Sequence, residues 1–212
     1  MSVIQLMLPQ VEADDIIGYV CNLSEYKDWQ KVIVSSDKDF LQLCDEDTVL
    51  FRPIQKQVLN SKRVVETYGV HPQNFALARA ICGDKSDNLP GVRGIGLPTV
   101  AKRLPFLSEE RFYTIDEVVE FCDNSESNAK AYKLITENRE LIEHNYKLMQ
   151  LYAPSISVQG KKKLQYAVEN FVFEANFTEV KKMMIEDGFG TVDFSELFAT
   201  IKRIVADNNI KD

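Results

Sequence analysis

Three short clusters of carboxylates are the residues of this sequence whose types and spacing could do chemistry. Each cluster lies where an apolar segment meets a helix or a loop, so one fold could bring all three together. Like charges about 5 Å apart repel by about 3 kcal/mol at an effective dielectric near 20, and protons or bound cations must compensate. Converging acids therefore predict a site for hard divalent metals. The clusters are Glu12, Asp14 and Asp15; Asp37 and Asp39; and Asp84 and Asp87.

The first two clusters also have simple structural explanations. Acids favour helix N-termini because they complement the macrodipole, and Glu12 and Asp15 lie one turn apart on a helix face with Asp14 beside them. Asp37 and Asp39 follow a β-branched run, which is where open α/β sheets place their ligands. A solvated turn with a helix cap explains the same pair. Neither cluster alone decides between these readings.

The third cluster is more specific because a glycine-rich turn follows it directly. The segment GDKSDNLPGVRGIG joins the paired acids to Gly91, Gly94 and Gly96, and glycine permits positive φ and close backbone approach. Amides exposed at this turn, and at the start of the next helix PTVAKRL, can cradle a phosphate. A tight helix–helix turn without a ligand is the alternative, but such a turn needs only one or two glycines.

Strands and helices must alternate to position the first two clusters. Residues 3–8 (VIQLML) predict a buried strand, and a helix with apolar residues at helical spacing begins near Glu12. Residues 31–36 (KVIVSS) are typical of a parallel strand with both faces covered. Residues 40–43 predict a helical turn and residues 48–51 another strand. This order predicts an α/β layered core with a partial parallel or mixed sheet.

From residue 60 onward the pattern becomes helical. Ser61–Tyr68 predicts a helix that Gly69 ends, and Pro72 and Pro98 each begin another. Residues 147–152 (KLMQLY) predict a strand that returns to the core. Three parts are therefore expected: the later half of an α/β core at 1–59, a helix–hairpin–helix region at 60–107 and a helical C-terminal region at 108–212.

Composition and charge restrict the function classes. No run of about 18 apolar residues and no basic leader are present, which argues against a membrane or secreted protein. Four widely spaced cysteines form no CxxC pair and fit a reducing cytosol. The net charge of −7 equals the charge of the clustered acids, so it does not exclude nucleic acid as a partner. His71 and His144 are isolated, which predicts surface or capping roles rather than metal ligation.

The ordered motifs EADD, SSDKDFLQL and GDKSDNLPGVRGIGLPTVAKRL resemble the 5′-nuclease (flap endonuclease) superfamily, of the bacterial and bacteriophage type. The resemblance covers roughly residues 3–107 and includes the nuclease domain of bacterial DNA polymerase I. It implies a PIN-like 5′-nuclease fold with a helix–hairpin–helix (H3TH) motif. The implied function is metal-dependent hydrolysis of DNA with 5′ ends, flaps or branches, and of RNA in RNA–DNA hybrids, in replication or repair. The implied location is the cytoplasm of a bacterium or a bacteriophage-infected host.

The resemblance also implies roles for the acids. Two Mg²⁺ or Mn²⁺ ions about 3.5–4 Å apart would activate a water and stabilise the departing oxygen of a phosphodiester. The first ion and its waters would be bound by Glu12, Asp14, Asp15 and Asp37, and the second by Asp39, Asp84 and Asp87. The residues expected to be catalytic are Asp37, Asp39, Asp84 and Asp87.

The resemblance also implies that the hairpin binds the duplex backbone without recognising base sequence. It further implies that backbone carbonyls of the hairpin bind K⁺. Phosphate contacts of this kind make DNA binding strongly salt-dependent. The expected DNA-binding residues are Gly91, Arg93, Gly94, Gly96, Thr99, Lys102 and Arg103.

The sequence departs from the pattern of this family in two ways. Family members carry a further N-terminal portion before EADD, with a metal-binding Asp and a basic helical arch, so we expect a separately encoded N-terminal half or a fragment. PTVAKRL also departs from the usual lysine-threonine-alanine helix start.

Two other function classes remain as alternatives. A non-catalytic helix–hairpin–helix protein would bind duplex DNA even in EDTA. A haloacid-dehalogenase-like phosphatase also has DxD after a strand, but it requires Thr or Val where Leu41 stands.

Overall fold

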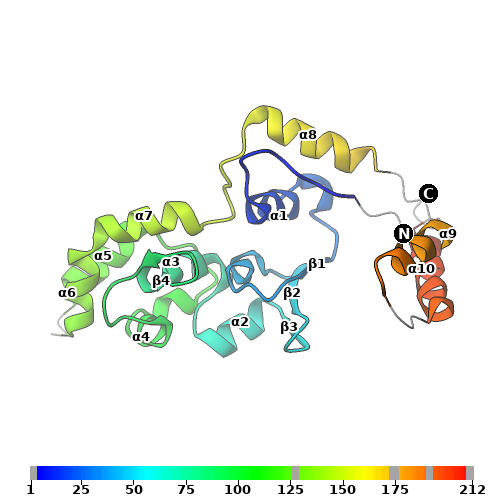
Figure 1. Ribbon diagram of the computed structural model, residues 1–212. Helices are drawn as coiled ribbons and strands as arrows, with labels where there is room; N and C mark the ends of the chain where they lie inside the picture. Colours follow the sequence, from blue (N-terminus) through cyan, green and yellow to red (C-terminus); the bar gives the residue numbers. More distant parts are fainter. Residues whose placement is uncertain (1–3, 126–128, 172–176, 190–192, 209–212) are drawn as a thin grey trace. The chain divides into compact units, whose positions relative to one another are not determined.

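The computed structural model describes residues 4–125, 129–171, 177–189 and 193–208 (Figure 1). The chain divides into two compact units, Gln10–Ile156 and Met1–Pro9 with Ser157–Asp212. Among the described residues, no helix is both long and apolar enough to span a bilayer. All seven predicted metal ligands belong to the first unit.

A small mixed sheet forms the α/β part of the first unit. The helix α1 (Ala13–Cys21) precedes β1 (Lys31–Val34), which pairs in parallel with β2 (Thr48–Arg52) from Lys31 opposite Thr48 onward. A turn then brings β3 (Gln57–Leu59) back antiparallel to β2. The predicted mixed sheet is confirmed, although β3 was not expected from the sequence.

The strand β1 differs from the prediction in how it is covered. It was expected to be buried on both faces, but only Ile33 is buried, and Val32 and Val34 are 55% and 64% exposed. In the part of the chain that the structure describes, β2 is the only strand paired with β1. An edge strand of this kind keeps one row of backbone groups unpaired.

Two other predicted strands are wrong. Residues 4–8 form no strand and pair with no strand among the described residues; residue 3 of that prediction lies outside the described residues. Residues 147–149 belong to the helix α7 (Arg139–Met149), and residues 150–152 form no strand. The buried residues Ile142, Asn145 and Met149 follow one another at helical spacing, which explains why α7 extends this far.

Helices build the rest of the first unit, and local signals explain several of their ends. Gly69 ends α2 (Ser61–Tyr68) in the left-handed conformation at φ 68°, as predicted. Thr114 and Glu117 form a reciprocal capping box at the start of α5. The other helices of this unit are η1 (Ser24–Tyr26), η2 (Asp39–Leu43), α3 (Pro72–Cys82), α4 (Leu97–Arg103), η3 (Pro105–Ser108), α5 (Ile115–Asn124) and α6 (Lys130–Glu137), and a short hairpin of β4 (Gly83–Asp84) and β5 (Leu89–Pro90) joins α3 to α4. The second unit contains α8 (Val158–Glu169), α9 (Phe177–Glu186) and α10 (Phe194–Asn208).

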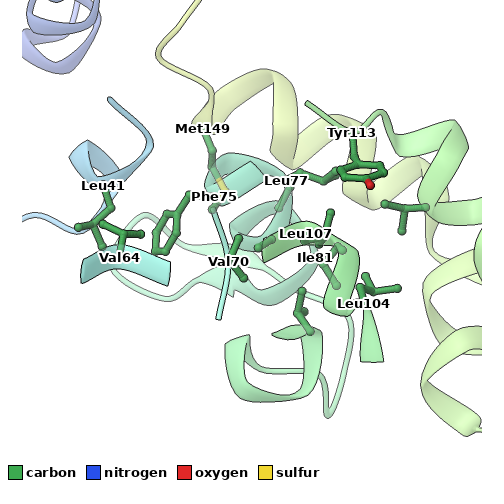
Figure 2. Close-up of a cluster of buried hydrophobic side chains, with 14 of the residues drawn as sticks. Leu41, Val64, Val70, Phe75, Leu77, Ile81, Leu104, Leu107, Tyr113 and Met149 are labelled. Atoms are coloured by element: carbon green, nitrogen blue, oxygen red, sulfur yellow. The ribbon is translucent and has the colours of Figure 1, made fainter. Parts of the chain in front are cut away.

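The hydrophobic core of the first unit is built around α3. This helix buries Phe75, Leu77 and Ile81, and Figure 2 shows them with Leu107 and Met149. The helix packs against α7, η2 and α4, which are distant from one another in sequence. Because α3 leads directly into the hairpin with Asp84, this packing fixes where the third acidic cluster lies.

His71 is the buried N-cap residue directly before α3, which agrees with the predicted capping role. Its Nδ1 accepts the backbone N–H of Gln73 at 3.4 Å, and its Nε2 lies 3.0 Å from the hydroxyl of Ser61. Burial lowers the pKa of His71, and the nearby carboxylate of Glu110 opposes this shift in part. The folded protein therefore holds this imidazole in its neutral form more strongly than the unfolded chain does.

We expect this histidine to reduce stability as the pH falls. Below an ordinary histidine pKa near 6.5, the unfolded chain takes up the proton first, so the free energy of unfolding decreases. The variant His71→Asn keeps a side-chain acceptor at the helix start but does not titrate. In urea unfolding, the wild type should lose more stability than His71→Asn between about pH 7.5 and pH 5.5. His144→Asn, which alters an exposed histidine, is the control, and equal losses in all three proteins would contradict the prediction.

Candidate metal centre

The third acidic cluster lies on a tight hairpin between α3 and α4. The strands β4 (Gly83–Asp84) and β5 (Leu89–Pro90) pair antiparallel, with Asp84 opposite Leu89. Asp87 lies in the turn that joins them, where Asn88 has a positive φ of 57°. The hairpin thus places two carboxylates close to each other at the end of the buried helix α3.

The three glycines after this hairpin have different structural roles. A Cβ on Gly91 would lie 1.9 Å from the carbonyl oxygen of Cys82 and 2.5 Å from the nitrogen of Gly83, both backbone atoms. Gly94 adopts φ 82° with open space around it. Gly96 has an extended φ of −107° as the residue before α4, so neither positive φ nor close approach requires glycine there.

Alanine substitutions should therefore destabilise the protein in a graded series. Gly91→Ala should cost about 3 kcal/mol, because two backbone segments must move apart. Gly94→Ala should cost about 1 kcal/mol, the typical penalty for a Cβ in the left-handed region. Gly96→Ala should change stability by less than about 0.5 kcal/mol, as surface changes usually do. Urea unfolding of the three variants measures the series, and a Gly91→Ala protein as stable as Gly96→Ala would refute it.

Asn145 of α7 anchors the base of the hairpin from a distant part of the sequence. Its side-chain amide donates to the carbonyl oxygens of Ala80 at 3.0 Å and Pro90 at 2.9 Å. The residue is fully buried, so these two hydrogen bonds fix the end of α3 and the strand β5 together. Gln42 makes a second such link, because its amide binds the carbonyl of Met149 at 3.0 Å and the N–H of Leu151 at 2.7 Å.

Carboxylates from two clusters meet at this hairpin. Oxygens of Asp39, Asp84 and Asp87 all lie within 4.8 Å of one another. Asp39 begins η2 directly after the loop that follows β1, and its N–H donates to Oδ1 of Asp37 at 2.9 Å. The strand end and the hairpin, about forty-five residues apart along the chain, therefore supply one common group of acids.

The helix α1 adds Asp14 to the same electrostatic environment. Burial raises the pKa of Asp14 most, and the carboxylates of Asp37, Glu12, Asp15 and Asp87 raise it further. Since Asp37 and Asp87 belong to the other two clusters, Asp14 interacts with all three. Repulsion between these acids at neutral pH is the situation that a bound cation relieves.

The other acids of the predicted set differ in their surroundings. Burial raises the pKa of Asp15 most, and the carboxylate of Glu12, which belongs to the same cluster, raises it further. Burial is also the main reason that the pKa of Asp39 is raised, although Arg79 opposes the shift while Asp37 and Asp87 add to it. The structure thus groups Asp14 with the second and third clusters and leaves Asp15 beside Glu12.

Arg79 is the residue at this centre that the sequence reasoning missed. Its Nε donates to Oδ1 of Asp39 at 3.1 Å, and its other guanidinium nitrogen contacts Oδ2 of Asp84. Arg79 is the only charged residue in α3, whose other side chains are largely buried. A lone charge within the run ALARAIC was the available signal, because an arginine in an apolar helix needs a partner.

The predicted DNA-binding residues lie after the hairpin rather than among the acids. Arg93, Gly94, Gly96 and Lys102 are exposed. Gly91, Thr99 and Arg103 are partly buried, and the carbonyl of Arg103 accepts the hydroxyl of Tyr132 at 3.1 Å. Their contacts with DNA stay predictions.

Known proteins share both the sequence and the fold of this chain. Residues 1–69 match the family described as "5'-3' exonuclease, N-terminal resolvase-like domain". A 5'-3' exonuclease from Aquifex aeolicus is 32% identical over 147 residues, which cover 69% of this chain and 47% of that protein. These matches support the 5′-nuclease superfamily as the group to which this chain is similar. It spans about half the length of the Aquifex relative.

Other superfamily members match shorter parts. A DNA polymerase I from Streptococcus pneumoniae is 42% identical over 103 residues, covering 46% of this chain and 12% of that protein. Among solved structures, "Divalent metal ions (zinc) bound to T5 5'-exonuclease" aligns with a TM-score of 0.64 and 20% identity over 76% of this chain and 60% of that one. This likeness confirms the predicted PIN-like 5′-nuclease fold.

The clustered acids of this chain fit a divalent metal. The group of Asp39, Asp84 and Asp87 offers only carboxylate oxygens, which are the ligands that Mg²⁺ and Mn²⁺ prefer. Their mutual distances allow oxygens of all three to approach one ion. Divalent metal use is therefore consistent with the residues present.

Proposed function

We propose that this chain is part of a metal-dependent 5′ nuclease that hydrolyses phosphodiesters in DNA with 5′ ends, flaps or branches. One observation carries the proposal: acids from three separate segments converge, with oxygens of Asp39, Asp84 and Asp87 within 4.8 Å and Asp14 interacting with Asp37 and Asp87. The RNA strand of RNA–DNA hybrids is a second proposed substrate. The proposed setting is replication or repair in the cytoplasm of a bacterium or a bacteriophage-infected host.

The acids would bind two metal ions at two positions. Asp39, Asp84 and Asp87 would hold one ion, and the other ion and its waters would be held by Glu12, Asp14, Asp15 and Asp37. Mg²⁺ or Mn²⁺ at such positions lowers the pKa of water and stabilises negative charge on phosphate oxygens. The protein's own contribution is to fix the carboxylates on a strand end, a helix start and a hairpin before substrate arrives.

The region from α3 to α4 is proposed to bind duplex DNA as a helix–hairpin–helix motif. Arg93 and Lys102 are exposed there and would contact phosphates without reading bases. Gly91 supports the proposal, because the backbone of Cys82 and Gly83 packs so closely against it that the hairpin must be tight. Potassium bound to carbonyls of this turn remains part of the proposal.

A complementary N-terminal nuclease half is the proposed protein partner. The strand β1 has one described neighbour, and its Val32 and Val34 side chains are exposed. A further parallel strand beside β1 would pair its free edge, and helices packed on that face would cover these valines. Such a half would also supply the additional acid and the basic helical arch that the family resemblance implies.

One observation favours a different function, that of a non-catalytic DNA-binding protein. Arg79 pairs with both Asp39 and Asp84, so these two carboxylates have a cationic partner without any metal. A binding protein derived from a nuclease could keep its acids in this neutralised form. Its duplex binding would survive EDTA, and no added polypeptide would produce cleavage.

A flap-cleavage assay separates the two functions. The chain is incubated with a labelled 5′-flap substrate in Mg²⁺ or EDTA, alone and together with the N-terminal portion of a homologous 5′-3′ exonuclease. The nuclease proposal expects Mg²⁺-dependent products in at least one of these mixtures. Salt-dependent binding with no product in any mixture would instead establish the binding protein.

A further inference from the structure

Both carboxylate oxygens of Asp84 have partners within the protein itself. Its Oδ1 accepts the N–H of Ser86 at 2.7 Å and the Ser86 hydroxyl, and its Oδ2 contacts the guanidinium of Arg79. The same guanidinium binds Oδ1 of Asp39 at 3.1 Å. Arg79 therefore holds one carboxylate oxygen of each of two members of the acidic group.

The position of Arg79 is set by the core rather than by the surface. Its helix α3 is buried along most of its length, so the Arg79 backbone cannot move away independently. The side chains are also shielded from solvent, with exposed fractions of 18% for Arg79, 14% for Asp39 and 12% for Asp84. Charges at this depth are screened weakly by salt, so the pairs are stronger than surface ion pairs.

We propose that Arg79 is an internal cation that occupies the Asp39–Asp84 position in place of a divalent ion and must be displaced when the ion binds. This inference rests on the proposed metal centre and adds a competition to it. Two of the three carboxylates, those of Asp39 and Asp84, bind one guanidinium, so Arg79 reduces their repulsion and keeps them together in the metal-free protein. The same positive charge repels an incoming divalent cation.

The competition has a definite consequence for how the centre fills. Ion binding at Asp39, Asp84 and Asp87 must break two ion pairs, so this position should fill at a higher metal concentration than its carboxylates alone would require. Asp14 and Asp37 have no ion pair with an arginine or lysine among the described residues. We therefore expect the position near Asp14 to fill first.

Removing the charge of Arg79 tests the competition directly. The variant Arg79→Gln retains a hydrogen-bonding side chain but carries no charge, and Mn²⁺ binding to the metal-stripped 212-residue chain is measured by titration calorimetry. We expect the weaker Mn²⁺ site to bind about tenfold more tightly in the variant, which corresponds to about 1.4 kcal/mol. If Arg79 merely positioned the carboxylates, its loss would weaken binding instead.

A matched control is available elsewhere in the chain. Arg139 also bridges two carboxylates, those of Asp116 and Glu143, so Arg139→Gln removes the same charge from a two-carboxylate bridge on the exposed surface. This variant should leave Mn²⁺ affinity unchanged. Equal tightening in both variants would show a general effect of net charge and would overturn the role of Arg79.

Thermal unfolding gives a second readout that a purely structural arginine would not reproduce. Without metal, Arg79→Gln should melt at a lower temperature than the wild type, because its acids repel one another without a cation. Saturating Mn²⁺ should bring the two melting temperatures together. A variant that stays equally destabilised with and without Mn²⁺, or that fails to fold even in Mn²⁺, would contradict the proposal.

The outcomes also separate this inference from the proposed metal centre. If neither the wild type nor Arg79→Gln takes up Mn²⁺, the metal centre and the competition both fail. If the wild type takes up Mn²⁺ and the variant binds it no more tightly, only the competition fails.

Discussion

Asp84→Asn together with Asp87→Asn should abolish divalent metal uptake at the acidic hairpin and, with it, Mg²⁺-dependent cleavage. The double variant removes two of the three carboxylates whose oxygens lie within 4.8 Å, while it keeps the size of each side chain. Loss of residues that only orient metal ligands already costs about 10- to 100-fold in affinity or activity, so loss of two ligands should cost at least about 100-fold. Calorimetry with Mn²⁺ and the flap-cleavage assay measure the two effects.

DNA affinity in EDTA decides whether this loss is specific. The hairpin glycines and the basic residues after it are unchanged in the double variant, so binding should remain close to that of the wild type. Asp28→Asn with Glu46→Gln is the matched control, since it neutralises two exposed acids outside the converging clusters. A loss of DNA binding as large as the loss of cleavage would contradict the assignment of these acids to metal.

Arg93→Ala together with Lys102→Ala should weaken DNA binding and flatten its salt dependence. Both side chains are exposed next to the hairpin, and each is expected to neutralise one phosphate. Each phosphate contact contributes about 0.9 to the slope of log affinity against log salt, so the slope should decrease by about 1.8 in magnitude. Fluorescence anisotropy of labelled duplex DNA at several salt concentrations measures it.

Lys27→Ala together with Lys62→Ala is the control for this second prediction. These two exposed lysines carry the same total charge but lie outside the region from the hairpin to α4. Their removal should leave the salt slope close to that of the wild type. If both double variants change the slope equally, the hairpin has no special part in binding DNA.

Local signals predicted the elements near the hairpin well. The helix Ser61–Tyr68 and its end at Gly69 were predicted to the residue, because a left-handed glycine after a helix is a strong stop signal. The start of α3 at Pro72 was predicted for a similar reason. Convergence of the second and third acidic clusters was also predicted, since strand ends and hairpins commonly supply ligands to one site.

The errors arose where long-range packing decides the outcome. Residues 147–152 were predicted as a strand, but burial of Met149 against the core continues the helix α7 through residue 149. The strand β1 is parallel as expected, yet a β-branched run cannot reveal how many neighbours the strand has. Arg79 was missed because its partners lie 40 residues before it and 5 residues after it, and only the fold brings them together.

The amide of Asn145 has a consequence for the smallest polypeptide that could keep this acidic centre. It holds the carbonyls of Ala80 and Pro90, although it follows the last of the seven acids by 58 positions. A protein engineer who trimmed the chain just after α4 would retain every carboxylate and still leave two interior carbonyls without their donor. The smallest polypeptide that keeps this acidic centre must therefore reach at least the end of α7, and the hydrogen bond from the N–H of Leu151 to Gln42 extends that limit slightly further.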